Sequence, residues 1–403
     1  MPELFNAADW LVERHVRDGN GGRTAVVTPT RSLTYEELSG EVRRVAAGLR
    51  ALGVRPEERV LFCMADDIEL FTGILAAFRI GAVAVPASTM LTGAELGRLV
   101  ADCRSRVVLG SEEFAAVVRA AVQEAPEVER LLLGDDWREL QTSGEDGTAY
   151  PTWPDSPALW LYTSGTTGTP KAAMHRHADI AFVAENYGRQ VLGIGPEDRC
   201  LSVAKLFFAY GLGNSMFFPL AAGGTALLEP ARPSPALFAK RAAADRATVL
   251  FGVPGFLGAL LAGPDVPDDA FATVRVGVSA GEALPARIHR GMLERFGVEV
   301  LDGIGSTELL HIFISNGRGG STPVPPANLF RGTPWSCGTW TAASWRARAR
   351  PASCLCAGRP PPPVTGAGPR PAGRSSSASG CAPATPTSAT TTPPTPAWAA
   401  STT

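Results

Sequence analysis

The sequence predicts an α/β protein, and three features of its pattern support this. Short apolar runs such as Arg59–Cys63 and Ala82–Pro86 are typical of buried strands. Longer runs such as Ile68–Arg79 are typical of the helices that separate such strands. The alternation continues to about residue 316. Because short apolar strands separated by helices indicate parallel pairing, we expect parallel β/α sheets.

The individual elements are predicted in order from their end signals and apolar runs. Thr34 is a suitable N-cap followed by acidic residues, and the amphipathic helix that it opens should end at Gly53. Arg59–Cys63 and residues 82–86 follow as strands on either side of the helix Ile68–Arg79. Further strands are expected at residues 106–109, 199–203, 225–228, 248–251, 275–278 and 299–301.

Length and composition limit the class of protein. The chain has 403 residues, more than the roughly 250–300 at which a single core stops growing, so at least two structural units are expected. A net charge of −2 argues against a general nucleic-acid or membrane-surface partner. No apolar run reaches the roughly 18 residues of a spanning helix, and the N-terminus does not resemble a signal peptide. Seven cysteines without metal-ligand spacing predict a reduced, cytoplasmic protein.

The most informative segment is Tyr162–Lys171, with the sequence YTSGTTGTPK. Its glycines allow the backbone to approach a polyanion, and its N–H groups, hydroxyls and lysine can bind phosphate oxygens. The segment follows the apolar run 158–161, so we expect it at the end of a strand. The spacing between its glycine and its lysine differs from that of a G-x-x-x-x-G-K-[ST] loop. The alternative to a phosphate-binding loop is a flexible surface loop. The predicted phosphate-binding residues are Thr163, Ser164, Gly165, Thr166, Thr167, Gly168 and Lys171.

This loop resembles the phosphate-binding motif of the adenylate-forming superfamily, which includes acyl-CoA synthetases, luciferases and peptide-synthetase adenylation domains. Ser279–Pro285 resembles the segment that holds the adenine, and Asp302–Glu308 resembles the motif that contacts the α-phosphate and Mg²⁺. Lys205–Asn214 together with Ser306–Phe313 resembles the benzoate-CoA ligase branch. The likeness covers roughly residues 5–316. It implies the large-domain fold of that superfamily, with mixed β/α sheets.

The resemblance also implies roles for particular residues. The expected catalytic residues are Thr163, Lys171, Thr307 and Glu308, of which Glu308 would hold Mg²⁺. Besides the phosphate loop, the expected nucleotide-binding residues are Ser279, Ala280, Gly281, Glu282, Asp302, Gly303, Ser306 and Thr307. The expected aryl-acid pocket is formed by Ala209, Tyr210, Gly303, His311 and Ile312.

Structural alternatives exist for several of these residues. Glu308 could be a solvated acid at the start of a helix, and Gly281 with Glu282 could form an ordinary strand-to-helix turn. Asp302 could contact ATP or only close its strand. His311 could line the pocket or be a satisfied structural group.

Two charged features near the motifs, Asp66–Asp67 and Lys205, can be explained by structural roles. Asp66 and Asp67 have no partnering metal-ligand cluster, so we expect them in a solvated loop. Lys205 precedes the aromatic run of its motif, and a strand-end cation is the simplest interpretation of it.

The activity implied by the resemblance is that of an ATP-dependent aryl-CoA ligase. An aromatic carboxylate and ATP would give an acyl-adenylate, from which CoA would displace AMP. The expected ligands are an aromatic carboxylate, ATP, Mg²⁺ and CoA, with no nucleic-acid or membrane partner, and a homodimer is left open. The alternatives are a catalytically dead nucleotide- or carboxylate-binding remnant, and an aryl-adenylating enzyme that loads a carrier protein.

The chain changes character after about residue 318. Pro323–Thr403 contains no Asp or Glu and is dominated by Pro, Ala, Thr, Ser, Arg and Gly, a composition typical of disorder. We therefore expect residues 1–318 to form the large domain, incomplete at its C-terminal end. Residues 319–403 would be an irregular tail in place of the hinge and the small domain.

The tail is also consistent with a shifted reading frame. In a shifted frame, each codon would begin at the free third (wobble) base of one present codon and take its other two bases from the next codon. Residues 323–338 can then encode PGTSGKPVPGYAVELRD, and residues 378–403 can encode a segment with TGD and GRIDD. These resemble what the family shows after its Glu-bearing motif, including the ribose-binding aspartate and the hinge. We hypothesise a frameshift near residues 317–320, and we expect impaired activity in the chain as written.

Overall fold

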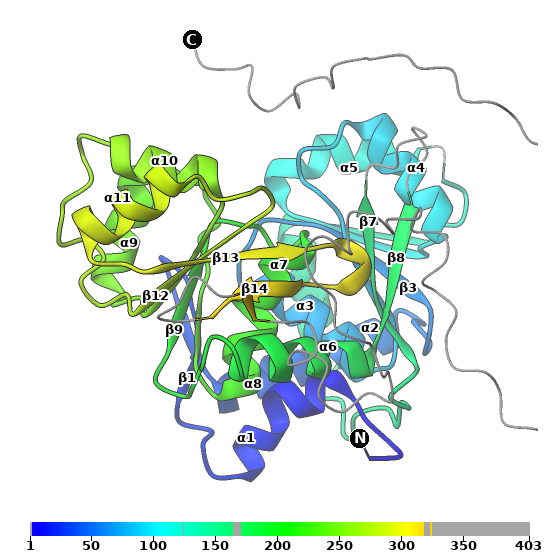
Figure 1. Ribbon diagram of the computed structural model, residues 1–403. Coiled ribbons are helices and arrows are strands. Elements are labelled where there is room, and N and C mark those ends of the chain that lie inside the picture. Colours follow the sequence, from blue (N-terminus) through cyan, green and yellow to red (C-terminus); the bar gives the residue numbers. More distant parts are fainter. Residues whose placement is uncertain (1, 124, 164–170, 318–322, 325–403) are drawn as a thin grey trace, which may run out of the picture. The chain divides into compact units, whose positions relative to one another are not determined.

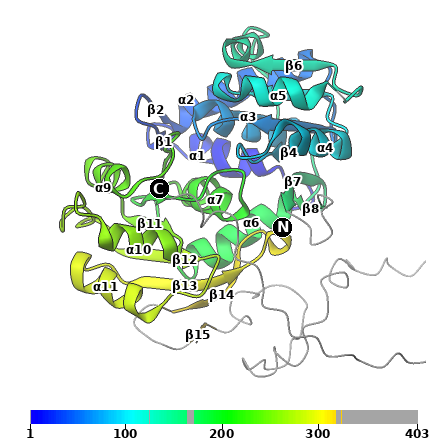
Figure 2. The ribbon, with the colours of Figure 1, turned by 90° about the horizontal axis from the view of Figure 1, so that it is seen from above.

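The computed structural model describes residues 2–123, 125–163, 171–317 and 323–324. All of them belong to the first of two compact units, Met1–Trp340. Two β-sheets and the helices around them form this part of the chain (Figures 1 and 2).

The six-stranded sheet has the order β6-β5-β3-β4-β7-β8. Its neighbouring strands are parallel except for β7 and β8, which form an antiparallel pair at one edge. The strands are β3 (Arg59–Cys63), β4 (Val83–Pro86), β5 (Val107–Gly110), β6 (Arg130–Leu133), β7 (Pro157–Thr163) and β8 (Lys171–Arg176).

The nine-stranded sheet has the order β15-β14-β13-β12-β11-β9-β10-β1-β2. Its middle strands are parallel, and β2, β14 and β15 run antiparallel at the two edges. The strands are β1 (Thr24–Val27), β2 (Ser32–Thr34), β9 (Arg199–Ser202), β10 (Thr225–Leu227), β11 (Val249–Gly252), β12 (Val276–Ala280), β13 (Val300–Gly305), β14 (Ile312–Asn316) and β15 (Pro323–Val324).

The helices connect these strands, and several have clear end signals. Thr34 and Glu37 form a capping box at the start of α2, as the sequence predicts, and Gly53 follows its end with a φ of 85°. The α-helices are α1 (Arg14–Arg17), α2 (Tyr35–Ala51), α3 (Ile68–Arg79), α4 (Gly93–Cys103), α5 (Ala115–Val122), α6 (His177–Val183), α7 (Ala209–Leu212), α8 (Phe218–Ala222), α9 (Pro235–Ala244), α10 (Pro254–Ala262) and α11 (Ala286–Phe296). Short 3-10 or π turns are η1 (Asp9–Glu13), η2 (Glu112–Phe114), η3 (Gly134–Gln141), η4 (Ala184–Arg189), η5 (Gly213–Phe217) and η6 (Thr307–Leu309). Among the described residues, no helix has both the length and the apolarity that a membrane crossing requires.

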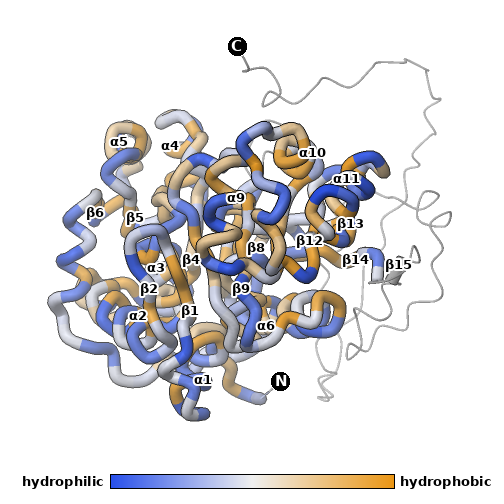
Figure 3. Tube along the Cα trace, turned by 90° about the vertical axis from the view of Figure 1, so that its left-hand side faces the viewer, coloured by the Kyte–Doolittle hydropathy of each residue, from blue (hydrophilic) through white to orange (hydrophobic). Residues whose placement is uncertain are grey.

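The two faces of each sheet pack into different cores. In β3, Val60 and Phe62 join a large core that includes residues from both sheets and from α2, α3, α6 and α8, whereas Leu61 faces α4 and α5. Likewise, the other face of the nine-stranded sheet packs against α9, α10 and α11. In Figure 3, α10 is mostly orange and α11 carries much more blue. Helix α11 buries Ile288, Met292 and Phe296 and exposes a polar face, whereas α10 is apolar nearly throughout although only Pro254, Leu257 and Leu260 are buried.

The predicted α/β fold class, with mixed β/α sheets, is confirmed, and the described elements lie close to their expected positions. Helix α3 and strand β3 have the predicted bounds. Strand β13 continues to Gly305, beyond the expected residues 299–301, because its second half pairs with β14. The antiparallel edges were not expected from the buried-strand pattern, which indicates burial but not strand direction. The predicted tail, residues 319–403, lies outside the described residues except for β15.

Candidate active site

The predicted phosphate loop connects two adjacent antiparallel strands. Thr163 ends β7 and Lys171 begins β8, and the two residues face each other in the ladder. The predicted ligands Ser164, Gly165, Thr166, Thr167 and Gly168 lie outside the described residues. The hairpin therefore places the loop at the C-terminal end of β7, in agreement with the expected position at a strand end.

A hydrogen bond ties the base of this hairpin to α4. The Tyr162 hydroxyl donates to Oδ2 of Asp102, with 2.5 Å between the oxygens. Burial is the main cause of a raised pKa for Tyr162, and the bond to Asp102 raises it further, so the phenol stays protonated. Tyr162, the residue before Thr163, is thereby held by a helix outside the hairpin.

Strand β8 also contacts the turn that carries the predicted magnesium ligand. In Figures 1 and 2 the turn between β13 and β14 comes close to β8, and β8 contacts η6. His175 on β8 is buried and hydrogen-bonds to the backbone of Thr307. Burial lowers the pKa of His175, although the charges of Asp179 and Glu308 and the Thr307 bond oppose this shift. The phosphate hairpin and the Thr307–Glu308 turn are therefore neighbours.

The turn after β13 is tight and partly strained. Oγ of Ser306 accepts a hydrogen bond from the backbone N–H of Leu309, with 3.3 Å between the atoms. Leu310 has a φ of 65°, a left-handed conformation that costs a residue other than glycine about 1–3 kcal/mol. A Cβ atom at Gly305 would lie 2.9 Å from the carbonyl oxygen of His311. This geometry leaves the Glu308 side chain exposed at the end of the sheet.

The predicted adenine segment lies at the adjacent strand end. Ser279 and Ala280 end β12, where they pair with Asp302 and Gly303 of β13. Ser279 is fully buried, and its hydroxyl has no hydrogen-bond partner among the described residues. The chain then turns at Gly281, whose φ of 96° suits glycine. Glu282, the next residue, is exposed.

Asp302 bridges the adenine segment and β13. Its Oδ2 accepts a hydrogen bond from the backbone N–H of Leu284 at 3.2 Å. Its Oδ1 is buried without a partner among the described residues, and burial raises the pKa of the carboxyl group. Asp302 thus has a structural role, one of the two roles that the sequence left open.

The predicted aryl-pocket residues come together around His311. Nε2 of His311 lies 3.1 Å from Oδ1 of Asn214 and 3.4 Å from the carbonyl oxygen of Tyr210. Because the Tyr210 carbonyl can only accept, this nitrogen carries the proton. The His311 ring also packs against Phe218, with 4.5 Å between centroids, and Tyr187, with 5.6 Å. Burial lowers the pKa of His311 to about 3, so the imidazole is neutral.

Close backbone approach brings the remaining wall residues into contact. A Cβ atom at Gly303 would lie 2.8 Å from the Ile312 side chain, and one at Gly213 would lie 2.3 Å from Cδ2 of His311. The Tyr210 hydroxyl donates to the carbonyls of Gly252 and Val278, both at 3.2 Å. The structure therefore places Tyr210 of α7 against β11 and β12.

Two sequence-based interpretations need correction. Asp66 is not in a solvated loop: it is buried, its carboxylate accepts a hydrogen bond from the backbone N–H of Leu206 at 2.9 Å, and burial raises its pKa to about 7. Asp67 is the N-cap of α3. Lys205 is more than a strand-end cation, because its ammonium donates to the carbonyls of Glu229, Pro230 and Ala231. Both errors arose because the contacting groups are far away in the sequence.

Some residues of the site were missed by sequence reasoning. Asn214 is the last residue of the segment Lys205–Asn214, but no role was predicted for it. Its side-chain amide donates a hydrogen bond to Ser202, the last residue of β9. Tyr187, Phe218 and His175 had no local signal, because each is recognisable only from its neighbours in space.

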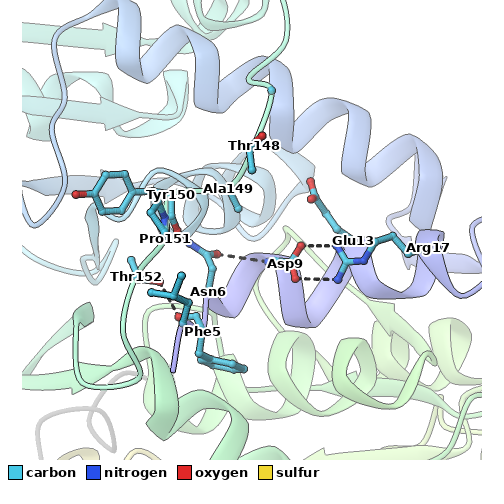
Figure 4. Close-up of a pocket in the computed structure, with 12 residues that line it drawn as sticks. Phe5, Asn6, Asp9, Glu13, Arg17, Thr148, Ala149, Tyr150, Pro151 and Thr152 are labelled. Atoms are coloured by element: carbon cyan, nitrogen blue, oxygen red, sulfur yellow. Dashed lines mark hydrogen bonds and ion pairs between the residues drawn. The ribbon is translucent and has the colours of Figure 1, made fainter. Parts of the chain in front are cut away.

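The cavity shown in Figure 4 lies elsewhere. It has a volume of about 280 Å³ and is lined by η1 and by residues 147–152. Its charged groups are already paired: Arg17 with Asp9 at 2.9 Å, and Glu13 with the buried Arg79. None of the predicted site residues lines it, so we regard it as a structural feature of the N-terminal region.

The described residues contain no cluster of three or more His, Cys, Asp or Glu side chains that could hold a metal ion. A lone exposed carboxylate at Glu308 nevertheless fits Mg²⁺, because protein sites commonly hold this ion with one or two carboxylates plus substrate phosphates and water.

Comparison with known proteins agrees with this geometry. The chain is 42% identical over 326 residues to the benzoate–CoA ligase of Thauera aromatica, covering 79% of this chain and 62% of that protein. A benzoate CoA ligase structure from Burkholderia xenovorans LB400 has a TM-score of 0.74 at 39% identity, covering 78% of this chain and 63% of that one. An anthranilate CoA ligase in complex with anthranoyl-AMP has a TM-score of 0.77 at 31% identity, covering 81% and 64%.

The chain therefore spans about three fifths of the length of its benzoate–CoA ligase relatives. Residues 12–340, most of the chain, match the family described as AMP-binding enzyme. On that match and on the arrangement of its strand ends, this chain belongs to the AMP-binding enzyme family.

Proposed function

We propose that this chain carries the nucleotide and aryl-acid sites of an ATP-dependent aryl-CoA ligase of the benzoate type. The proposal is supported by three contacts among the predicted residues and elements: Tyr210 with His311, Gly303 with Ile312, and the turn between β13 and β14 with β8. A neutral imidazole among aromatic rings suits the flat apolar ring of an aromatic acid. The similarity to benzoate and anthranilate CoA ligases supports the same substrate class.

The reaction would proceed in two displacements. A carboxylate oxygen of the aromatic acid would attack the α-phosphorus of ATP, forming a C–O–P linkage as the bond to pyrophosphate breaks. The CoA thiol would then attack the acyl carbon, and AMP would leave. Both steps depend mainly on positioning and on neutralising negative charge.

The predicted roles fall into two groups: those of the β7–β8 hairpin, and those of the ends of β12 and β13 that lie near it. Thr163 and Lys171 would bind the β- and γ-phosphates, with the loop between them. Thr307 would contact the α-phosphate, and Ser306 would hold the turn through its cap at Leu309. Ser279–Glu282 would lie along the adenine, and the free oxygen of Asp302 would face the nucleotide. When bound, Mg²⁺ would neutralise phosphate charge beside Glu308.

We further propose that residues 1–318 form the large domain and that the tail is the product of a shifted frame. The ribose-binding aspartate and the hinge expected by resemblance cannot be read in residues 319–403. The chain as written should therefore bind nucleotide and aryl acid yet turn over slowly. We place it in the cytoplasm, where ATP and CoA are found; the three described cysteines are free thiols.

An exchange assay tests the proposal. Benzoate-dependent exchange of labelled pyrophosphate into ATP is measured for this chain and for a version with the frame restored after residue 317. We expect strong exchange and benzoyl-CoA formation only in the restored version. Absence of benzoate-dependent exchange in both would reject the function. Exchange without CoA transfer would favour an enzyme that loads a carrier protein. Normal turnover by the 403-residue chain would reject the frameshift.

A further inference from the structure

We propose that Asp66 is a positioning residue for the aryl-acid site, because its carboxylate holds the backbone of Leu206 and so fixes the segment that carries Ala209 and Tyr210. This inference rests on the proposed function. It assigns a task to a buried acid that belongs to none of the motifs.

The hydrogen bond links the two sheets. Asp66 follows β3 of the six-stranded sheet, and Leu206 follows β9 of the nine-stranded sheet, 140 residues later in the chain. Asp66 is 6% exposed and Leu206 is fully buried. Because Asp67 caps α3 directly afterwards, the backbone that presents the Asp66 carboxylate is itself held in place. The contact is therefore a fixed tie rather than a surface interaction.

The segment 205–210 is anchored on several sides. Its first residue, Lys205, is bound to the carbonyls of residues 229–231, and its last, Tyr210, to those of Gly252 and Val278. These anchors all belong to the nine-stranded side. The Asp66 bond joins the segment to the sheet that carries the phosphate hairpin. Asp66 can thereby set the aryl wall relative to the nucleotide side.

The chain turns sharply in the segment 205–210, so a small displacement of Leu206 would be transmitted to Tyr210. Phe208 N–H donates to the Lys205 carbonyl at 3.0 Å, and a Cβ atom at Gly211 would lie 1.9 Å from the same carbonyl oxygen. Loss of the bond to Leu206 would move the segment against Gly211, the residue that directly follows Tyr210. The positive charge of Lys205 lowers the energetic cost of burying the Asp66 carboxylate but does not supply the bond.

Three variants separate positioning from simple stability. Asp66→Ala removes the acceptor, and Asp66→Asn keeps an acceptor oxygen without the charge. Asp198→Ala is the matched control, because Asp198 is a buried, hydrogen-bonded aspartate at the opposite end of β9. Asp66→Leu, which also lacks an acceptor and fills the site with a larger apolar side chain, replaces Asp66→Ala if that variant does not fold. Folding is checked by circular dichroism, and affinities are measured at a temperature at which every variant is folded.

The probes are a benzoyl-sulfamoyl-adenosine analogue of the acyl-adenylate, and Mg·ATP alone. We expect Asp66→Ala to weaken the analogue about tenfold while Mg·ATP affinity changes less than about twofold, since one buried hydrogen bond is at stake. Asp66→Asn should restore analogue affinity to within about threefold. Asp198→Ala should lower thermal stability and leave analogue affinity unchanged.

Two results would overturn the inference while leaving the proposed function intact. One is wild-type analogue affinity in Asp66→Ala or Asp66→Leu. The other is an equal loss of analogue affinity in Asp66→Ala and Asp198→Ala, which would show a general effect of instability. If the wild-type chain itself does not bind the analogue, both the inference and the proposed function are wrong.

Discussion

The residues of the predicted aryl wall and those of the predicted phosphate side are built in opposite ways. The aryl wall consists of buried groups held by contacts between distant segments, such as His311 with Asn214 and Tyr210. On the phosphate side, the described charged groups Lys171 and Glu308 are exposed. The difference indicates that changes on the aryl side should affect folding and binding together. Changes on the phosphate side should affect chemistry with little effect on stability.

The largest expected effect is on the buried side. His311→Ala removes a ring that packs against Phe218 and Tyr187, so we expect a loss of about 3 kcal/mol in the free energy of unfolding, as for other large core truncations. The measurement is urea denaturation followed by circular dichroism. His289→Ala on α11 is the control and should cost far less. Equal losses in the two variants would contradict the comparison.

On the exposed side, Glu308→Gln should change activity alone. We expect benzoate-dependent pyrophosphate exchange in the frame-restored chain to fall by about 100-fold, because the residue would no longer offer a charged ligand to Mg²⁺. The thermal midpoint should stay within error, since the side chain is exposed. Glu294→Gln, an exposed change on α11, should alter neither quantity. A large loss of stability in Glu308→Gln would remove the distinction between the two sides.

His311 should contribute part of the pH dependence of stability, in addition to the buried His15, His175 and His177, whose pKa values burial also lowers. The unfolded chain protonates the His311 imidazole below about pH 6.5, whereas the folded chain resists protonation until a pKa of about 3. The stabilising contribution is therefore present above pH 6.5 and is lost as the pH falls, by about 2 kcal/mol at pH 5. The buried Asp66, with a pKa raised to about 7, acts in the opposite direction.

The difference between wild type and His311→Gln isolates this contribution, because the effect of Asp66 is present in both proteins. Denaturation at pH 8, 6.5 and 5 should show the wild type losing more stability than the variant at low pH. Parallel curves would mean that His311 is not held neutral.

The smallest expected effect concerns packing behind the wall. Gly213→Ala places a Cβ atom against the His311 ring, so we expect the affinity for the benzoyl-sulfamoyl-adenosine analogue to fall about tenfold. Isothermal titration measures the change. Gly22→Ala is the control, because a Cβ atom there meets nothing within 4 Å. Unchanged affinity in Gly213→Ala would show that the His311 ring can shift without affecting the wall.

Much of the fold was predictable because its signals are local. Strand β3 and helix α3 carry their apolar runs and end residues within a few positions, and the Thr34 capping box lies within four residues. The antiparallel pairing of β13 with β14 was not predictable, because a buried strand has the same pattern in either direction. The same limit explains Asp66, whose partner is 140 residues away.

By itself, the sequence determined the α/β class, the family resemblance and the kinds of chemistry at each motif, because glycine turns, hydroxyls and charges act through local spacing. Only the tertiary structure decided that His311 is buried, neutral and bound to Asn214, and that Asp302 is bound to the backbone of Leu284 in the predicted adenine segment. It also decided that Asp66 is buried between the two sheets. These outcomes depend on burial and on contacts between distant segments, which set protonation and position and leave no local pattern in the chain.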